Sequence, residues 1–179
     1  LRRSEESYKQ LVESASDIIY RTDYKGNFTY ANPVATRITE YRAEELLGKN
    51  YLELVRPDWR KHMQDFYGKQ FKDRITLTYC ELPILTKSGK EVWIGQNIRL
   101  ITEGDWVVGF QGVARNITGR KRAELELWRE KEFSESLINS SFDGILAFDR
   151  ECRYTVWNPG MERISGISKE ACLGHCAFE

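Results

Sequence analysis

Residues that build disulfide frameworks, metal centres and catalytic dyads are scarce in this sequence. It has four cysteines and two histidines among 179 residues, and three of the cysteines lie between residues 152 and 176. Cysteines this few and uneven do not form the disulfide framework of a small secreted domain, which predicts a reduced, cytoplasmic setting. Neither histidine has a nucleophile pattern around it, and no glycine-rich phosphate loop or kinase signature is present. We therefore predict no enzyme active site within these residues.

Long apolar runs and an excess of either charge are also absent. No apolar stretch approaches the roughly 18 residues that span a bilayer, and no signal peptide opens the sequence. Lys and Arg number 27, as do Asp and Glu. With zero net charge, no overall field favours nucleic acid or an anionic membrane. The sequence thus predicts no nucleic-acid partner and no membrane contact by this segment, while an anchor elsewhere in a longer parent protein stays open.

The sequence does contain an internal repeat. Residues 140–179 align with residues 14–53 without a gap, and 13 of the 40 aligned pairs are identical. Self-similarity at a fixed offset is the signature of repeated structural units. We predict a linker helix over residues 1–13, a complete domain over 14–118, an exit helix over 119–139 and the N-terminal part of a second domain over 140–179. Ala123, Leu127 and Leu137 lie near one apolar seam of the exit helix, which fits either a short coiled coil or a solvated connecting helix. The partial copy lacks the strands that would close a sheet, so we expect it to be marginal by itself.

The pattern of residues predicts an α+β fold for the complete domain. Hydrophobic residues make up 41% of the sequence, which is enough for packed cores. Helices are expected from Pro33, over residues 42–47 and from Pro57 to about Lys72, and the exit helix is expected to be capped by Thr118. Alternating β-rich runs bounded by turn residues predict strands at 18–23, 27–32, 75–86, 90–102 and 106–117. This order fits one five-stranded antiparallel sheet with helices on one face.

With this order in place, the sequence resembles the PAS family of sensor domains, in the variety that carries a C-terminal PAC motif. Four runs in the complete domain carry the resemblance: Ser14–Ile19, Asp23–Gly26, Tyr30–Pro33 and Glu44–Gly48. A fifth stretch, Arg115–Glu124, resembles the family's closing motif and the start of its exit helix. The match covers residues 14 to about 124, and residues 140–179 match the first third of the family pattern. The family usually has aspartate where this chain has Asn116, and commonly glutamate where it has Gly119.

The resemblance implies a sensory and dimerisation module of a signalling protein, such as a histidine kinase of a two-component phosphorelay. It implies a homodimer through the flanking helices and the outer face of the sheet, with adjacent signalling domains as further partners. A small ligand, redox state or partner would be detected, and the change would pass into the exit helix. The relay residues carried over from the family's closing motif are Arg115, Asn116, Ile117 and Thr118. A passive interaction or spacer module with a filled core is the alternative.

The interior of the complete domain is the expected ligand site, if the core is not filled. Phe66, Tyr67 and Phe71 of the long helix are expected to face the sheet. Side chains that combine an apolar body with a polar group suit such an interior. The candidate ligand-binding residues are Asn32, Tyr51, Phe66, Tyr79, Trp93, Gln96 and Phe110.

Two cofactor classes, haem and flavin, can be tested against the residues. His62 on the long helix is a weak haem candidate, because the family's haem-binding pattern places the ligand near Met63 or Gln64 instead. Tyr51 follows Gly48-Lys49-Asn50, where the family's flavin photosensors carry a reactive cysteine, and a phenol cannot form that adduct. A haem- or flavin-binding sensor is therefore an alternative that we do not favour.

Two further clusters have ordinary explanations. Cys172, His175 and Cys176 are spaced like metal ligands, but the first copy has other residues at these positions. We therefore predict no metal site there. Arg120-Lys121-Arg122 is a short basic run at the start of a helix, and we expect it to form a solvated helix surface rather than a nucleic-acid site.

Overall fold

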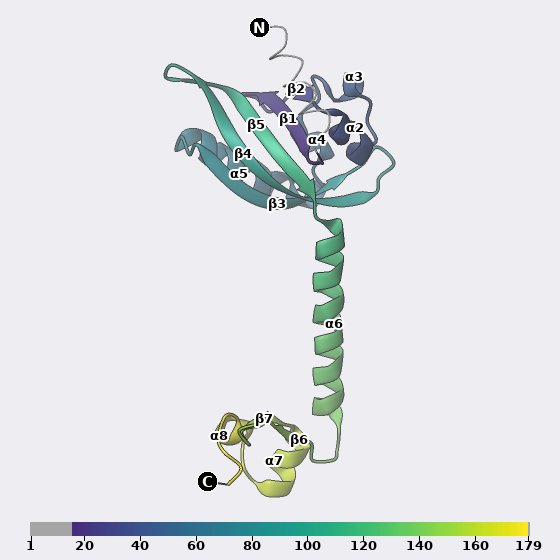
Figure 1. Ribbon diagram of the computed structural model, residues 1–179, viewed down its shortest axis with the longest axis vertical. Helices are drawn as coiled ribbons and strands as arrows, with labels where there is room; N and C mark the ends of the chain where they lie inside the picture. The colour runs from purple at the N-terminus through teal and green to yellow at the C-terminus, as the bar shows by residue number, and fades with distance from the viewer. Residues whose placement is uncertain (1–15, 179) are drawn as a thin grey trace. The chain divides into compact units, whose positions relative to one another are not determined.

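The computed structural model describes residues 16–178 (Figure 1). The chain divides into two compact units, of which the first ends at Lys121 and the second begins at Arg122. The helix predicted over residues 1–13 lies outside the described residues. Within residues 16–178, no helix is both long and apolar enough to cross a membrane.

The first unit is built on a five-stranded antiparallel sheet with the order β2-β1-β5-β4-β3. Its strands are β1 (Ile18–Asp23), β2 (Phe28–Ala31), β3 (Leu77–Leu85), β4 (Glu91–Glu103) and β5 (Trp106–Asn116). β5 pairs with both β1 and β4, so the last strand along the chain lies in the middle of the sheet. The predicted α+β fold is confirmed, and the strand ends differ from the predicted ranges by at most two residues.

Five short helices connect β2 to β3 and supply the helical layer of the first unit. They are α2 (Pro33–Thr39), α3 (Ala43–Leu46), α4 (Tyr51–Leu54), η1 (Pro57–Trp59) and α5 (Arg60–Lys72). The four-residue helix α4 was not predicted, although Asn50 caps it by accepting a hydrogen bond from the backbone N–H of Leu52. The helix predicted from Pro57 begins as a 3₁₀ turn and becomes α-helical only at Arg60.

The hydrophobic core lies between these helices and the inner face of the sheet. Alternate residues of β4 point inward, because successive side chains of a strand lie on opposite faces. The most deeply buried apolar side chains come from helices and strands alike: Leu46, Val55, Met63, Leu82 and Ala114. The outer face is more open, with Val113 of β5 39% exposed and Tyr79 of β3 54% exposed.

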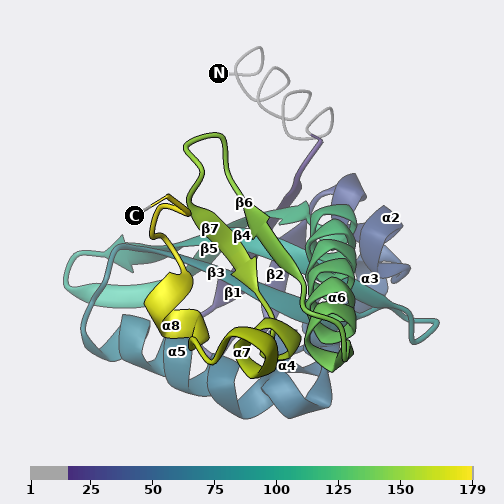
Figure 2. The same cartoon turned by 90° about the horizontal axis from the view of Figure 1, so that it is seen from below.

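The second unit repeats the first elements of the first unit. It contains β6 (Leu146–Phe148), β7 (Tyr154–Trp157), α7 (Pro159–Ser165) and α8 (Lys169–Cys172), with β6 and β7 paired antiparallel (Figure 2). In both units, the asparagine before the first helix accepts a hydrogen bond from the backbone N–H of an isoleucine and donates one to the carbonyl oxygen of an aspartate. These contacts join Asn32 to Ile19 and Asp17, and Asn158 to Ile145 and Asp143. The sequence repeat is thus also a repeat of hydrogen bonds.

The helix α6 (Thr118–Ser140) begins in the first unit and continues into the second. None of its 23 residues is buried. Leu127 is 69% exposed and Leu137 is 55% exposed, and both lie near the apolar seam that the sequence predicts for a short coiled coil. The helix itself is present, while its pairing with a second helix stays a prediction.

Candidate functional site

A cavity of about 250 Å³ lies between α5, the β1–β2 hairpin and the inner face of the sheet. Six of its eleven lining residues are aromatic: Tyr20, Tyr24, Tyr51, Tyr67, Phe71 and Phe110. The hairpin adds Lys25, which is the only charged side chain of the lining. A concave aromatic surface with few polar groups is typical of a small-molecule site.

A buried hydrogen-bond network closes the inner end of this cavity. The hydroxyl of Tyr20 donates to Oε1 of Gln96 over 2.9 Å, and Nε2 of Gln96 donates to the hydroxyl of Tyr67 over 2.5 Å. The hydroxyl of Tyr67 also lies 3.1 Å from Sγ of Cys80. Burial raises the pKa of both tyrosines well above the ordinary value of 10, and it also raises the pKa of the Cys80 thiol. The network is therefore neutral, and Cys80 is not an activated thiolate.

Beyond this network, the interior toward α2, α3 and α4 is closely packed. A second cavity there has a volume of only about 50 Å³ and is lined by Tyr20, Tyr51 and Gln96 together with core residues. Such a volume holds no more than about three water molecules. Between the helices and the inner face of the sheet, space for a larger molecule is therefore found on the hairpin side of Tyr20 and Tyr51.

The structure places the seven candidate ligand-binding residues in different environments. Tyr51 and Phe110 line the larger cavity, and Gln96 lies in the network behind it. Asn32 is fully buried but holds the start of α2, and Phe66 packs on the core beside the cavity.

Tyr79 and Trp93 do not face the interior, and their predicted placement there was wrong. Tyr79 is 54% exposed and donates its hydroxyl hydrogen bond to Glu81, and Trp93 donates from Nε1 to Glu91. The alternation of buried and exposed residues along β4 could have predicted which side chains face the interior. Residues 92, 94, 98 and 100 are buried and apolar, so Gln96 points inward and Trp93, three residues away, points outward. The predictions missed Tyr20, Lys25 and Gly68, which only the tertiary fold brings together.

The four predicted relay residues lie at a junction between the sheet and α6. Oδ1 of Asn116 accepts a hydrogen bond from the backbone N–H of Thr118 over 3.0 Å. The hydroxyl of Thr118 accepts from the backbone N–H of Trp93 over 2.9 Å, and the N–H of Ile117 donates to the carbonyl oxygen of Trp93 over 2.8 Å. The prediction that Thr118 caps the helix was therefore wrong, because its hydroxyl contacts β4. Thr118, the first residue of α6, is instead held by the side-chain amide oxygen of Asn116. This contact needs no ion pair.

A carboxylate of β3 secures the first turn of α6. Glu81 forms ion pairs with Arg120 over 2.6 Å and with Lys121 over 2.8 Å, and it accepts a hydrogen bond from Tyr79. The hydrogen bonds from Lys121, Arg120 and Tyr79, in that order, lower the pKa of Glu81 to about 2. Arg120 and Lys121 therefore bind the sheet, which corrects the expectation of a solvated helix surface for these two residues.

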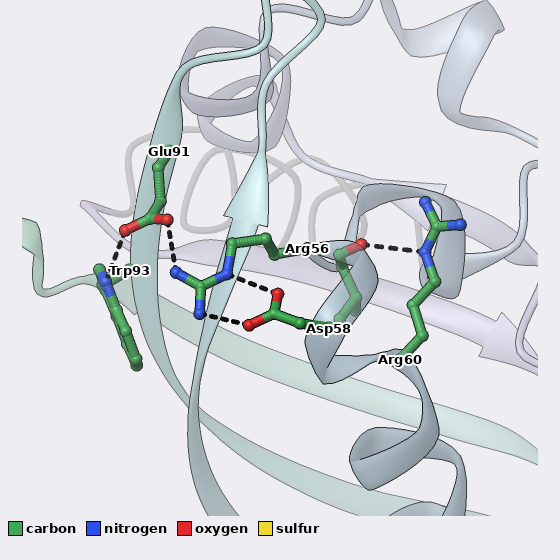
Figure 3. Close-up of polar contacts among 6 residues, drawn as sticks. Arg56, Asp58, Arg60, Glu91 and Trp93 are labelled. Carbon is green, nitrogen blue, oxygen red and sulfur yellow. Dashed lines mark hydrogen bonds and ion pairs between the residues drawn. The ribbon is translucent and has the colours of Figure 1, made fainter.

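A second chain of polar contacts reaches this junction from the start of the α5 region (Figure 3). The guanidinium of Arg56 binds both carboxylate oxygens of Asp58 over 2.7 and 2.8 Å, and it reaches Glu91 of β4 over 2.6 Å. Glu91 in turn accepts the hydrogen bond from Nε1 of Trp93 over 3.0 Å. The ring of Trp93 also lies 5.5 Å from Nζ of Lys121, a cation–π distance. Trp93 thus connects the η1 region with the exit helix.

The remaining relay residue, Arg115, points in the other direction along the sheet. It binds Asp17 through two hydrogen bonds of 2.8 Å, so the end of β5 is tied to the residue just before β1. The hydrogen bond from Arg115 lowers the pKa of the Asp17 carboxyl below its usual range. Bidentate contacts of this type fix orientation as well as distance.

The haem candidate His62 is exposed on α5, where its ring stacks edge-on to Trp59 at 5.6 Å. In the part of the chain that the structure describes, no group of three metal-ligating side chains comes together. His62 lines neither the cavity of about 250 Å³ nor the cavity of about 50 Å³.

Comparison with known proteins agrees with this geometry. A family profile described as the PAS fold matches residues 6–117. The chain belongs to the PAS family. This PAS protein is 28% identical over 149 residues to sporulation kinase C of Bacillus subtilis strain 168, an alignment that covers 79% of the chain and 34% of the kinase. It is 29% identical over 180 residues to sporulation kinase E of the same strain, covering 99% of the chain and 23% of that kinase. The chain thus spans 34% of the length of the first kinase and 23% of the second.

A solved structure shows the same fold. The PAS domain of a protein from Colwellia psychrerythraea superposes with a TM-score of 0.60 at 21% identity, covering 65% of this chain and 98% of that one. At this level of identity the likeness concerns the fold alone. The PAS sequence is thus homologous to parts of histidine kinases, and its architecture is that of known PAS domains.

Proposed function

We propose that this chain is a sensory module of a longer signalling protein of the histidine-kinase type, which passes a change in the PAS domain into the exit helix α6. Its setting would be cytoplasmic, and neighbouring domains of the parent protein would receive the signal. The observation that carries the proposal is the attachment of α6 to three strands. Glu81 of β3 contacts Arg120 and Lys121 in the first turn of the helix. Trp93 of β4 and Asn116 of β5 both contact Thr118, its first residue.

The relay follows from how these contacts are shared. A change in the α5 region would act on Arg56 and Glu91, and through them on Trp93. Trp93 holds Thr118 by its backbone N–H, so a displacement of β4 would alter the direction or the register of α6. A signal can shift this equilibrium only by binding the two arrangements with different affinity. The junction is the element on which that difference would act.

Glu81→Gln is expected to loosen the first turn of α6. Partly exposed ion pairs contribute up to about 1 kcal/mol, so amide hydrogen exchange at residues 121–124 should be about two- to fivefold faster than in the wild type. Because the pKa of Glu81 is lowered to about 2, the wild-type pairing holds at neutral pH and is lost as pH falls from about 4.5 toward 2. Glu126→Gln, at an exposed position of the same helix, is the matched control and should change nothing. Equal exchange in wild type and Glu81→Gln would remove Glu81 from the relay.

We also propose that the chain pairs with a second copy through the apolar seam of α6, with contributions from the outer face of the sheet. Leu127→Asp should then weaken association at least tenfold, because it places a charge in the seam. Leu125→Asp is the control, since Leu125 lies on the opposite side of the helix and is 45% exposed. Sedimentation equilibrium checks the masses. A wild-type chain that stays monomeric at high concentration would overturn the dimer.

The division into domains completes the proposal. We infer that residues 14–118 form one PAS/PAC domain, that 119–139 form the exit helix and that 140–179 belong to a second PAS domain. The repeated contacts of Asn32 and Asn158 support this division. In this arrangement α6 joins two sensor domains, so the second domain would receive the change that the first one passes on.

A further inference from the structure

We propose that the 250 Å³ cavity beside the β1–β2 hairpin binds a planar aromatic carboxylate of one or two rings. The inference rests on the proposed sensory function and names the ligand class for it. It is argued from three observations on the cavity: the character of its walls, the position of its polar groups and its size.

The walls are aromatic rings in mutual edge-on contact. The ring centroids of Tyr51 and Tyr67 are 5.4 Å apart at an interplanar angle of 83°, and those of Tyr67 and Phe110 are 6.4 Å apart at 61°. Phe71 continues the series at 6.5 Å from Phe110. Rings in these arrangements present both faces and edges to the cavity, and an aromatic guest meets such walls by stacking or edge-to-face contact. The walls therefore favour a flat ring system over a saturated one.

At the inner end of the cavity, the hydroxyls of Tyr20 and Tyr67 already have hydrogen-bond partners. The hydroxyls of Tyr20 and Tyr67 are both engaged with Gln96, and Tyr67 also contacts Cys80. A polar group buried there would lose its hydration without gaining a partner, which is costly. The part of the ligand that enters the inner end must therefore be apolar.

The hairpin end offers the opposite environment. Lys25 is exposed at this end, its ammonium group lies 5.6 Å from the ring centroid of Tyr24, and it has no carboxylate partner among the described residues. Gly26 lets the hairpin approach the Tyr51 ring closely, because a Cβ atom on it would meet that ring at 2.6 Å. Asp23 uses its carboxylate within the hairpin, on Lys25 N–H and on Asn27.

A cation at the hairpin end of an aromatic cavity suits one anionic oxygen group on a ring. A carboxylate accepts a hydrogen bond from the Lys25 ammonium group, and charge-assisted contacts of this type are stronger than neutral ones. The volume of the cavity limits the number of rings that the ligand can have. An engineered apolar cavity of roughly 150 Å³ holds benzene, so about 250 Å³ accommodates one or two fused rings.

The test is calorimetric titration of the whole chain with 2-naphthoate, 2-naphthamide and cyclohexanecarboxylate. We expect saturable binding of 2-naphthoate at one site per chain, with affinity at least fivefold lower for the neutral amide and for the saturated acid. Lys25→Gln should weaken 2-naphthoate at least fivefold and leave 2-naphthamide unchanged. Binding of all three probes with equal affinity, or no effect of Lys25→Gln, would overturn the assignment.

Gly68 offers a matched pair of variants for the location of the site. It lies on α5 in the cavity lining, and a Cβ atom on it would have no neighbour within 4 Å. Gly68→Phe should block the cavity and abolish binding. Gly68→Ala should keep binding and stabilise α5, because alanine is the better helix former. Binding that survives Gly68→Phe would place the ligand elsewhere and overturn the proposal.

Amide hydrogen exchange at residues 121–124 distinguishes a failure of the ligand site from a failure of the relay. Binding of 2-naphthoate that leaves this exchange unchanged supports the site and contradicts ligand-driven relay. Absence of binding, in a chain whose exchange still responds to Glu81→Gln, overturns the ligand class and leaves the relay standing.

Discussion

Replacing Asn32 with alanine is expected to lower the free energy of unfolding of the first unit by about 3 kcal/mol. The Asn32 side chain is fully buried and makes three hydrogen bonds to backbone groups of the described residues. Its Oδ1 accepts from Ile19 N–H over 3.0 Å and from Ala35 N–H over 3.2 Å, and Nδ2 donates to the Asp17 carbonyl over 3.0 Å. Loss of a helix cap costs about 1 kcal/mol, and each buried backbone group left without a partner costs about 1–3 kcal/mol.

The internal repeat supplies the control for this experiment. Asn158 makes the corresponding contacts in the second unit, so Asn158→Ala should destabilise that unit and leave the first unchanged. Native-state hydrogen exchange, read separately for β4–β5 and for β6–β7, distinguishes the two units. A change below about 1 kcal/mol in Asn32→Ala would mean that water replaces the lost contacts, contrary to their complete burial.

Gln96→Leu is expected to destabilise the first unit by about 2–3 kcal/mol and to change the inner end of the cavity. The substitution keeps a similar volume but removes the partner of the Tyr20 hydroxyl and one of the two contacts of Tyr67. A buried hydroxyl without a partner costs about 1–3 kcal/mol, while the Cys80 contact of Tyr67 remains. The freed hydroxyls would then present polar groups to the cavity.

Asn97→Leu is the matched control, because Asn97 is the next residue of β4 and is exposed on the outer face. Its change in stability should stay within about 0.5 kcal/mol. Denaturant unfolding followed by tyrosine and tryptophan fluorescence measures both variants. Equal stability of Gln96→Leu and wild type would show that the network adds nothing beyond an apolar pair of the same shape.

The two networks have different consequences because of where they lie. The Gln96 network is buried and neutral, so its loss acts mainly on stability and on the cavity. The Glu81 and Arg56 contacts are partly exposed ion pairs, which contribute little to stability. Weak contacts at the base of a helix suit a relay, since a small change in interaction energy can redistribute its two arrangements.

The sequence by itself determined the order of the elements. Turn residues at Gly26 and at Lys87-Ser88-Gly89, and the Asn-Pro pair at residues 32 and 33, act on their immediate neighbours, so their effect is readable locally. The repeat of residues 14–53 was equally readable, because it requires only comparison of the chain with itself. The five strands and the exit helix followed from these signals.

Tertiary structure alone decided which side chains meet. Trp93 faces outward because the buried residues of β4 fix the inner face, and a shift by one residue would have reversed every assignment. Glu81 meets Arg120 and Lys121 only because β3 and the end of β5 lie on either side of β4. Lys25, Tyr51 and Gly68 form one cavity although they come from a hairpin and two helices. Contacts between residues distant in the chain depend on the packing of all the elements, and no local pattern encodes them.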